Sequence, residues 1–191
     1  PIPACEGYLE AVPDRITDVV KRAQDDLSPA YLTVGTTRAP GLAHNRLSRC
    51  ADGTEVFGRQ FGDSPVIGAA GPIEDLLQTL NVYDEDKRLR AMVVSFACHP
   101  DISGGGSATA IDSDWPGEMA DYLRRVHGQD LACLFLQGPA GDVNQNDARG
   151  ETPRLTPPGR STIARGVAGA ALYSTEEIGR ASCRERVCHR V

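Results

Sequence analysis

Two clusters of polar residues each follow an apolar run, and both hold residue types that can do chemistry. The first, Cys98–Asp101, contains His99 and follows a continuous apolar stretch. The second, Gln137–Asp147, follows the apolar stretch Leu131–Leu136. An imidazole held at the end of a buried strand suits a metal ligand or an acid–base group. Because strand carboxyl ends converge on one crevice in open α/β sheets, we expect the two clusters to share a site.

Both clusters also have simpler interpretations. His99 could cap a strand end by hydrogen bonding, and spacing alone does not choose between this role and a functional one. Asp142 and Asp147 could be turn formers that bond their own backbone, as Asp often does beside Gly. Two other mechanisms lack support: Gly104–Gly106 has no phosphate-loop pattern around it, and there is no G-x-S-x-G elbow for a Ser–His–Asp triad. Metal, acid–base and structural roles therefore stay open.

The elements that would position these clusters alternate between strand and helix, which predicts an incomplete single α/β domain with a mixed sheet and flanking helices. The stretch Leu89–Cys98 predicts a central strand, and Leu131–Leu136 predicts a second buried strand. A helix is expected between them over 115–126, with Ser113 or Asp114 as its cap. Within the stretch 7–27, which has helical periodicity, a helix is expected to start near Pro13. Strands are expected at 31–37 and 76–83, although the periodicity of 76–83 also allows a helix. Long loops over 38–71 and a helix over 162–173 complete the expectations.

The composition is that of a globular domain, with 40% hydrophobic, 24% charged and 5% aromatic residues. The formal net charge of −6 argues against a nucleic-acid partner, which would require a basic face. No apolar run is long enough to cross a bilayer, so no transmembrane segment is expected. The start of the sequence shows no signal-peptide pattern, which leaves the compartment open. Cys98 and Cys133 lie in apolar runs and are interpreted as small buried residues, a nucleophilic role being the alternative.

Residues 178–191 differ in composition from everything before them. They hold four Arg and one Glu, and the stretch from Glu177 resembles the translation of a sequencing-adapter oligonucleotide fused in frame. Cys183, Cys188 and His189 look like part of a zinc cluster, but no further ligand is spaced to complete one. We therefore expect a partial α/β domain at 1–177 and a non-native tail at 178–191 that packs against nothing.

Four motifs in consistent order resemble the N-terminal domain of the neutral/alkaline (non-lysosomal) ceramidases. They are Asn45-Arg46, Val94–Pro100 (VSFACHP), Ile111–Gly117 (IDSDWPG) and Phe135–Asn144 (FLQGPAGDVN). The similarity extends over residues 7–173, and four ordered motifs are more specific than any one of them. The resemblance implies part of a zinc-dependent amidase that hydrolyses the N-acyl bond of ceramide or of a related lipid-like substrate.

The resemblance also implies roles for individual residues. His99 matches a zinc-binding histidine, and Arg46 matches an arginine that lines the active site. The loop Gly141-Asp142-Val143 matches the loop that carries the proposed catalytic serine, but Asn144 stands at the position of that serine and Gln145 at that of the following proline. An amide has no ionisable oxygen, so Asn144 cannot be the nucleophile, although it could orient a water or an oxyanion. The catalytic candidates are thus Asn144, Asp142 and Arg46, the substrate-binding candidates are Asn45, Gly141 and Asp114, and the metal-ligand candidate is His99.

The leading hypothesis from the sequence is part of a metal-dependent hydrolase of the neutral ceramidase type, with Zn²⁺ as its cofactor. Catalytic zinc usually has about three protein ligands, and His99 alone is matched here, so the chain by itself should bind zinc weakly and be inactive. The alternative is a non-catalytic lipid- or carbohydrate-binding domain on the same scaffold. A secreted or periplasmic location is implied by the resemblance alone.

Overall fold

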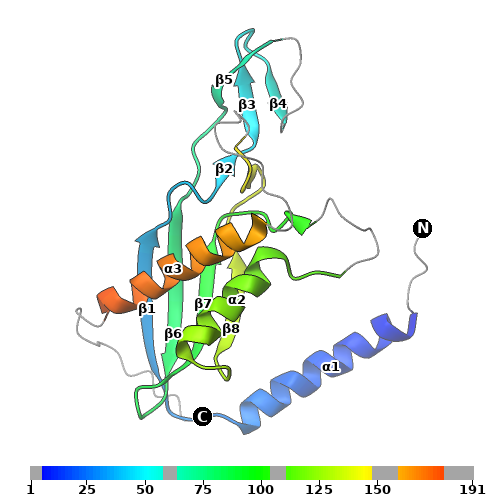
Figure 1. Ribbon diagram of the computed structural model, residues 1–191. Coiled ribbons are helices and arrows are strands. Elements are labelled where there is room, and N and C mark those ends of the chain that lie inside the picture. Colours follow the sequence, from blue (N-terminus) through cyan, green and yellow to red (C-terminus); the bar gives the residue numbers. More distant parts are fainter. Residues whose placement is uncertain (1–5, 58–63, 104–110, 148–158, 179–191) are drawn as a thin grey trace.

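A four-stranded mixed sheet forms the body of the chain. The computed structural model describes residues 6–57, 64–103, 111–147 and 159–178. Across the sheet the order is β1 (Tyr31–Arg38), β6 (Leu76–Tyr83), β7 (Leu89–Phe96) and β8 (Ala132–Gln137). The first two pairs are antiparallel, whereas β7 and β8 are parallel and are joined through α2 (Asp114–His127) (Figure 1). The predicted α/β class with a mixed sheet is confirmed.

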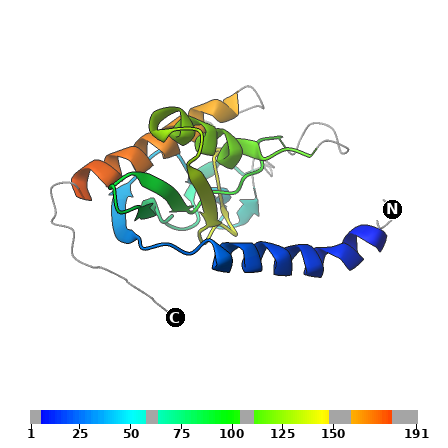
Figure 2. The same ribbon diagram turned by 90° about the horizontal axis from the view of Figure 1, so that it is seen from below.

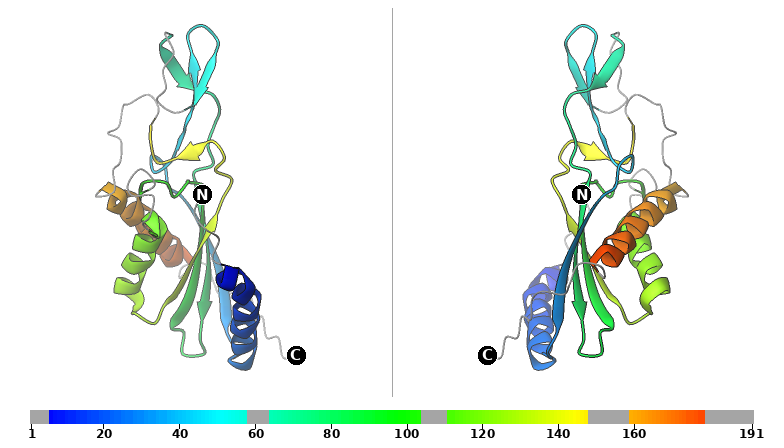
Figure 3. Two further views of the ribbon diagram at one scale, coloured as in Figure 1. Left: turned by 90° about the vertical axis from the view of Figure 1, so that its right-hand side faces the viewer. Right: turned by 90° about the vertical axis from the view of Figure 1, so that its left-hand side faces the viewer.

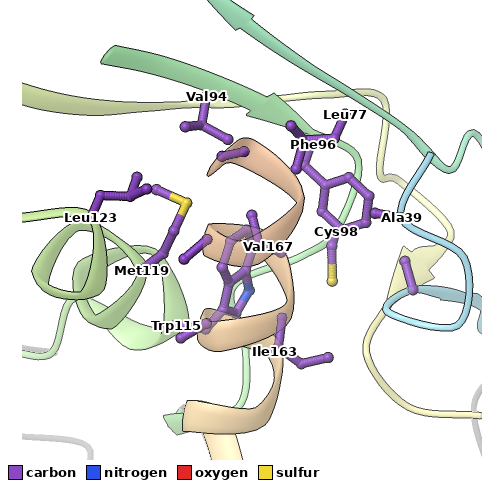
Figure 4. Close-up of a cluster of buried hydrophobic side chains, with 14 of the residues drawn as sticks. Ala39, Leu77, Val94, Phe96, Cys98, Trp115, Met119, Leu123, Ile163 and Val167 are labelled. Atoms are coloured by element: carbon purple, nitrogen blue, oxygen red, sulfur yellow. The ribbon is translucent and has the colours of Figure 1, made fainter. Parts of the chain in front are cut away.

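Helices α2 and α3 (Arg160–Ile178) cover one face of this sheet, as Figure 3 shows with the sheet seen nearly on edge. Trp115 of α2 packs edge-on against two sheet residues, with ring centroids 6.5 Å from Phe96 and 4.8 Å from Phe135. Removing such apolar side chains from water is the main stabilising term of the fold. The fully buried side chains around Trp115 include Leu77, Val94, Phe96, Met119, Leu123 and Val167 (Figure 4).

The opposite face of the sheet carries apolar side chains and no charge in its two central rows. Side chains two apart on a strand point to the same face, so the register defines these rows. The rows are Leu32–Val82–Ala91–Ala132 and Val34–Leu80–Val93–Leu134. Val34 is 66% exposed and Leu134 is 59% exposed, so the described residues leave this face largely uncovered. We call these eight residues the open face.

Helix α1 (Glu6–Asp25) lies on the same side of the sheet as the open face, opposite to α2 and α3 (Figures 2 and 3). It begins at Glu6 and contains Pro13, whereas the sequence predicts a start near Pro13, so that prediction is wrong. A proline inside a helix leaves one carbonyl, here that of Leu9, without its usual donor. Leu9 is 62% exposed, so water can satisfy this carbonyl and the helix continues through the proline.

The segment predicted as long loops over 38–71 contains four short strands instead. These are β2 (His44–Asn45), β3 (Leu47–Cys50), β4 (Glu55–Phe57) and β5 (Val66–Ala69). Strands β4, β3 and β5 form a small antiparallel sheet that extends beyond the end of the main sheet (Figure 1). Strand β2 pairs with β9 (Val143–Asn144), which is distant in sequence. Strands this short contain too few residues to show a period-2 pattern in the sequence. They form because they pair with other segments, which the local sequence does not reveal.

The predicted last helix is confirmed but longer, since α3 continues to Ile178. The expectations for the glycine run 104–106 and for the tail residues 179–191 lie outside the described residues. Within the described part of the chain, no helix combines the length and the apolarity needed to cross a membrane.

Candidate functional site

His99 follows the end of β7, and three contacts fix its position. Its backbone N–H donates to the carbonyl of Val143 at 3.1 Å, and its own carbonyl accepts a bond from the indole nitrogen of Trp115 at 3.3 Å. The ring Nδ1 lies 2.8 Å from the carbonyl oxygen of Ala140. Because a carbonyl can only accept, Nδ1 is the donor, and in the neutral ring the lone pair is on Nε2. His99 is therefore oriented as metal-binding histidines are, with the opposite ring nitrogen anchored to the protein.

The second polar cluster lies beside His99, as the sequence predicts. The chain leaves β8, turns through Gly141, and enters β9, whose Asn144 is paired with His44 of β2. The backbone bond between His99 and Val143 ties the loop after β7 to this turn. The two clusters thus meet at the carboxyl ends of the parallel strands β7 and β8, where open α/β sheets place their sites.

The pairing of β2 with β9 also brings Asn45 and Arg46 to this place. The side-chain amide of Asn45 donates to the carboxylate of Asp142 at 2.8 Å, and the backbone N–H of Arg46 donates to the carbonyl of Asp142 at 2.7 Å. Asn45 is buried, with 5% of its surface exposed. Asp142 is therefore hydrogen-bonded to residues far from it in sequence. A residue that only forms a turn would bond its own local backbone instead.

Arg46 connects three parts of the structure. Its Nη1 lies 3.5 Å from the carboxylate of Asp101, and its Nη2 donates to the carbonyl of Gly141 at 3.1 Å. Its guanidinium also lies over the ring of Phe57, 4.4 Å from the centroid, which adds a cation–π contact with β4. Its buried Nε has no hydrogen-bond partner among the described residues. The side chain is thus held in place before any ligand arrives.

Asp101 is the residue that sequence reasoning missed as a centre of the site. Its carboxylate accepts a bond from the amide of Gln145 at 2.8 Å and a longer one from the amide of Asn144 at 3.5 Å. The side-chain oxygen of Asn144 accepts from the backbone N–H of Asn146 at 2.9 Å. The amide of Asn144 is thus oriented at both ends. The only sequence signal for Asp101 was its place two residues after His99.

Asp114 belongs to the start of α2 rather than to the cluster around Asp101. It has a positive φ of 51°, and its carboxylate accepts from the backbone N–H groups of Trp115 at 2.7 Å and Ser103 at 2.6 Å. The predicted cap Ser113 is the N-cap residue but makes no side-chain capping bond. These two bonds give Asp114 a part in holding the loop after His99 against the helix.

Cys98 lies under the site with no surface exposed. Burial, and then the nearby carboxylates of Asp101 and Asp114, raise the pKa of its thiol to about 12. A nucleophilic cysteine needs a lowered pKa and access to solvent, so the structure gives Cys98 the character of a buried core residue.

The described residues do not by themselves complete a metal centre. Among residues 6–57, 64–103, 111–147 and 159–178 there is no group of three or more His, Cys, Asp or Glu side chains that could hold an ion. Catalytic zinc usually takes about three protein ligands. The Nε2 of His99 fits the role of one such ligand.

The fold and the site define a partial mixed α/β domain with polar loops gathered at its strand ends. Two of the solved structures that share this fold are ceramidases. The neutral ceramidase from Pseudomonas aeruginosa matches 97% of this chain with a TM-score of 0.61 and 18% sequence identity. A structure described as ceramidase complexed with C2 matches 89% with a TM-score of 0.57 and 17% identity. The chain corresponds to 28% and 25% of those two chains, about a quarter of their length.

No family model and no curated protein matches the sequence. At such low identity the structural likeness shows the fold alone. The resemblance to neutral ceramidases is therefore confirmed at the level of the fold, and the roles assigned to individual residues stay predictions.

Proposed function

We propose that this chain is part of a metal-dependent hydrolase of the neutral ceramidase type, which cleaves the N-acyl amide bond of ceramide or a related lipid-like substrate. One observation carries the proposal: His99 is anchored through Nδ1 to the carbonyl of Ala140, with Nε2 left to bind a ligand. The support from the fold is its likeness to two solved ceramidases.

In this proposal His99 provides one zinc ligand, and the others come from parts of the protein beyond the described residues. When bound, zinc would polarise the amide carbonyl and lower the pKa of a bound water. The protein's own contribution is a rigid setting, because the bonds of Asp142 to Asn45 and of Arg46 to Gly141 hold the two loops together. Such fixed polar groups are what catalytic sites require, since they need no rearrangement during reaction.

Asn144 limits the mechanisms that are open to this site. Its oxygen accepts from Asn146 and its nitrogen donates toward Asp101. Neither atom can attack a carbonyl, because an amide nitrogen has no available lone pair and an amide oxygen does not ionise. The second hydrogen of its NH₂ group could donate to a developing oxyanion. The same observation favours the alternative of a non-catalytic lipid- or carbohydrate-binding domain, because such a domain needs oriented amides but no nucleophile.

The test is hydrolysis of ceramide by the whole protein that contains this segment, measured by release of the fatty acid. We expect the His99→Ala variant to lose nearly all activity together with bound zinc. His127→Ala is the matched control, because His127 is exposed at the end of α2 and should leave both unchanged. Zinc bound through His99 without any amide cleavage would support the binding-domain alternative and contradict the hydrolase.

A further inference from the structure

Three donors from two separate segments converge on the carboxylate of Asp101. Arg46 approaches one oxygen at 3.5 Å, Asn144 approaches the same oxygen at 3.5 Å, and Gln145 donates to the other at 2.8 Å. The side chains of Arg46 and Asp101 are only 21% and 34% exposed. An ion pair that is largely withdrawn from water is screened much less than a surface pair. Asp101 therefore sets the local charge at this site.

The positive charge of Arg46 is compensated in this arrangement. Asp101 occupies one end of the guanidinium, the carbonyl of Gly141 accepts from the other, and the ring of Phe57 covers its face. The carboxylate of Asp142 is used elsewhere, because it accepts from the side-chain amide of Asn45 at 2.8 Å. One carboxylate thus accompanies one guanidinium, and an entering anion would meet a positive charge that Asp101 already neutralises.

The polar atoms that remain without partners suit a neutral ligand. Gln145 is 4% exposed, and its Oε1 has no hydrogen-bond partner among the described residues, nor does the buried Nε of Arg46. One is an acceptor and the other a donor, and buried polar groups of this kind are costly unless something pairs with them. An uncharged amide or hydroxyl group offers both a donor and an acceptor.

We propose that Asp101 determines the charge selectivity of this site: by neutralising Arg46 it makes the site accept uncharged polar groups and exclude anions. The proposal rests on the proposed function only in that both concern the loops after β7 and β8. Within that site, Asp101 is the residue that would favour a neutral amide substrate. Selectivity of this kind comes from an element that repels the wrong ligand.

The experiment measures binding of inorganic phosphate to the 191-residue chain, followed at the Nε–H resonance of Arg46 by NMR. The wild-type protein should show no saturable shift. The Asp101→Asn variant should bind phosphate at least about tenfold more tightly, because the guanidinium is freed and a repelling charge is gone. Asp101→Glu should restore the wild-type behaviour. Asp121→Asn, which removes an exposed carboxylate paired with Arg124, should also behave as wild type.

Equal phosphate binding by the wild-type and Asp101→Asn proteins would overturn the proposal, as would a gain of the same size in Asp121→Asn. If Asp101→Asn does not fold, Asp101→Ser provides the same removal of charge with a smaller side chain. The assay needs neither zinc nor catalysis, so its failure would leave the proposed hydrolase standing. A failed ceramide assay would likewise leave the charge selectivity of Asp101 intact.

Discussion

At the scale of single residues, Cys98 shows how burial decides chemistry. It has no exposed surface, and the pKa of its thiol is raised to about 12. We expect iodoacetamide at about pH 8.5 to leave Cys98 unmodified in the folded protein and to label it once the chain is unfolded. Peptide mass spectrometry measures both states. Rapid labelling of Cys98 in the folded protein would show that its thiol is accessible to solvent, which would contradict its burial.

The same thiol gives the protein a dependence on alkaline pH. In the unfolded chain Cys98 ionises near its ordinary pKa of 9.0, whereas in the folded protein it stays protonated up to about 12. The folded state then holds more protons than the unfolded state, so the free energy of unfolding should fall as pH rises from 9.0 toward 12. Urea titrations at several pH values measure this slope. Cys98→Ala should make it shallower, and an unchanged slope would exclude Cys98 as its source.

Part of the site could be predicted residue by residue and part could not. His99 and Asn144 each follow an apolar run that forms a strand, and that pattern was enough to place them together. The prediction that the second run is a buried strand is wrong, because β8 lies at the edge of the sheet and none of its residues is buried. The role of Asp101 depends on its contacts with Gln145, which follows β9, and with Arg46, which follows β2. Both are long-range consequences of strand pairing, which a local pattern does not contain.

At the scale of elements, the contact between β1 and α3 depends on a glycine. A Cβ at Gly35 would lie 2.7 Å from the hydroxyl of Thr79 and 2.9 Å from the backbone oxygen of Ser174. We expect Gly35→Ala to lower the free energy of unfolding by about 1–3 kcal/mol, because the helix would have to move off the sheet. Gly68→Ala in β5 is the control, since a Cβ there meets nothing within 4 Å. Chemical denaturation followed by circular dichroism compares them, and equal stability would contradict the close packing.

The elements visible in the sequence are those with strong local signals. The runs that became β7 and β8 are mostly apolar, and the α2 helix carries Pro116 in its first turn. Strands β2 and β9 are only two residues each and exist because they pair with one another. The predicted start of α1 was wrong because proline was assumed to fit only the first turn of a helix. In an exposed helix, water can replace the hydrogen bond that proline removes.

At the scale of the whole molecule, the open face distinguishes this domain from α/β domains whose sheet is covered by helices on both faces. Sheets with a parallel pair are usually covered on both faces, yet Val34, Leu80 and Leu134 are 66%, 38% and 59% exposed. An exposed apolar surface of this extent should bind the dye ANS. We expect Leu134→Lys to fold normally and to reduce dye fluorescence, because the new charge lies on an exposed row.

Leu77→Lys is the matched comparison, because Leu77 is fully buried on the helix-covered face of the same sheet. A charge there has no partner and should unfold the domain. Circular dichroism of both variants separates the two faces. Unfolding by Leu134→Lys would show that the open face is covered in solution.

The central proposal is that His99 is a zinc ligand of a hydrolase site at the ends of β7 and β8. The most direct measurement is calorimetric titration of zinc into the whole protein, its His99→Ala variant and the His127→Ala control. We predict stoichiometric binding by the wild type and the control, and a loss of at least about tenfold in affinity for His99→Ala. Equal zinc affinity with and without the His99 imidazole would contradict the account.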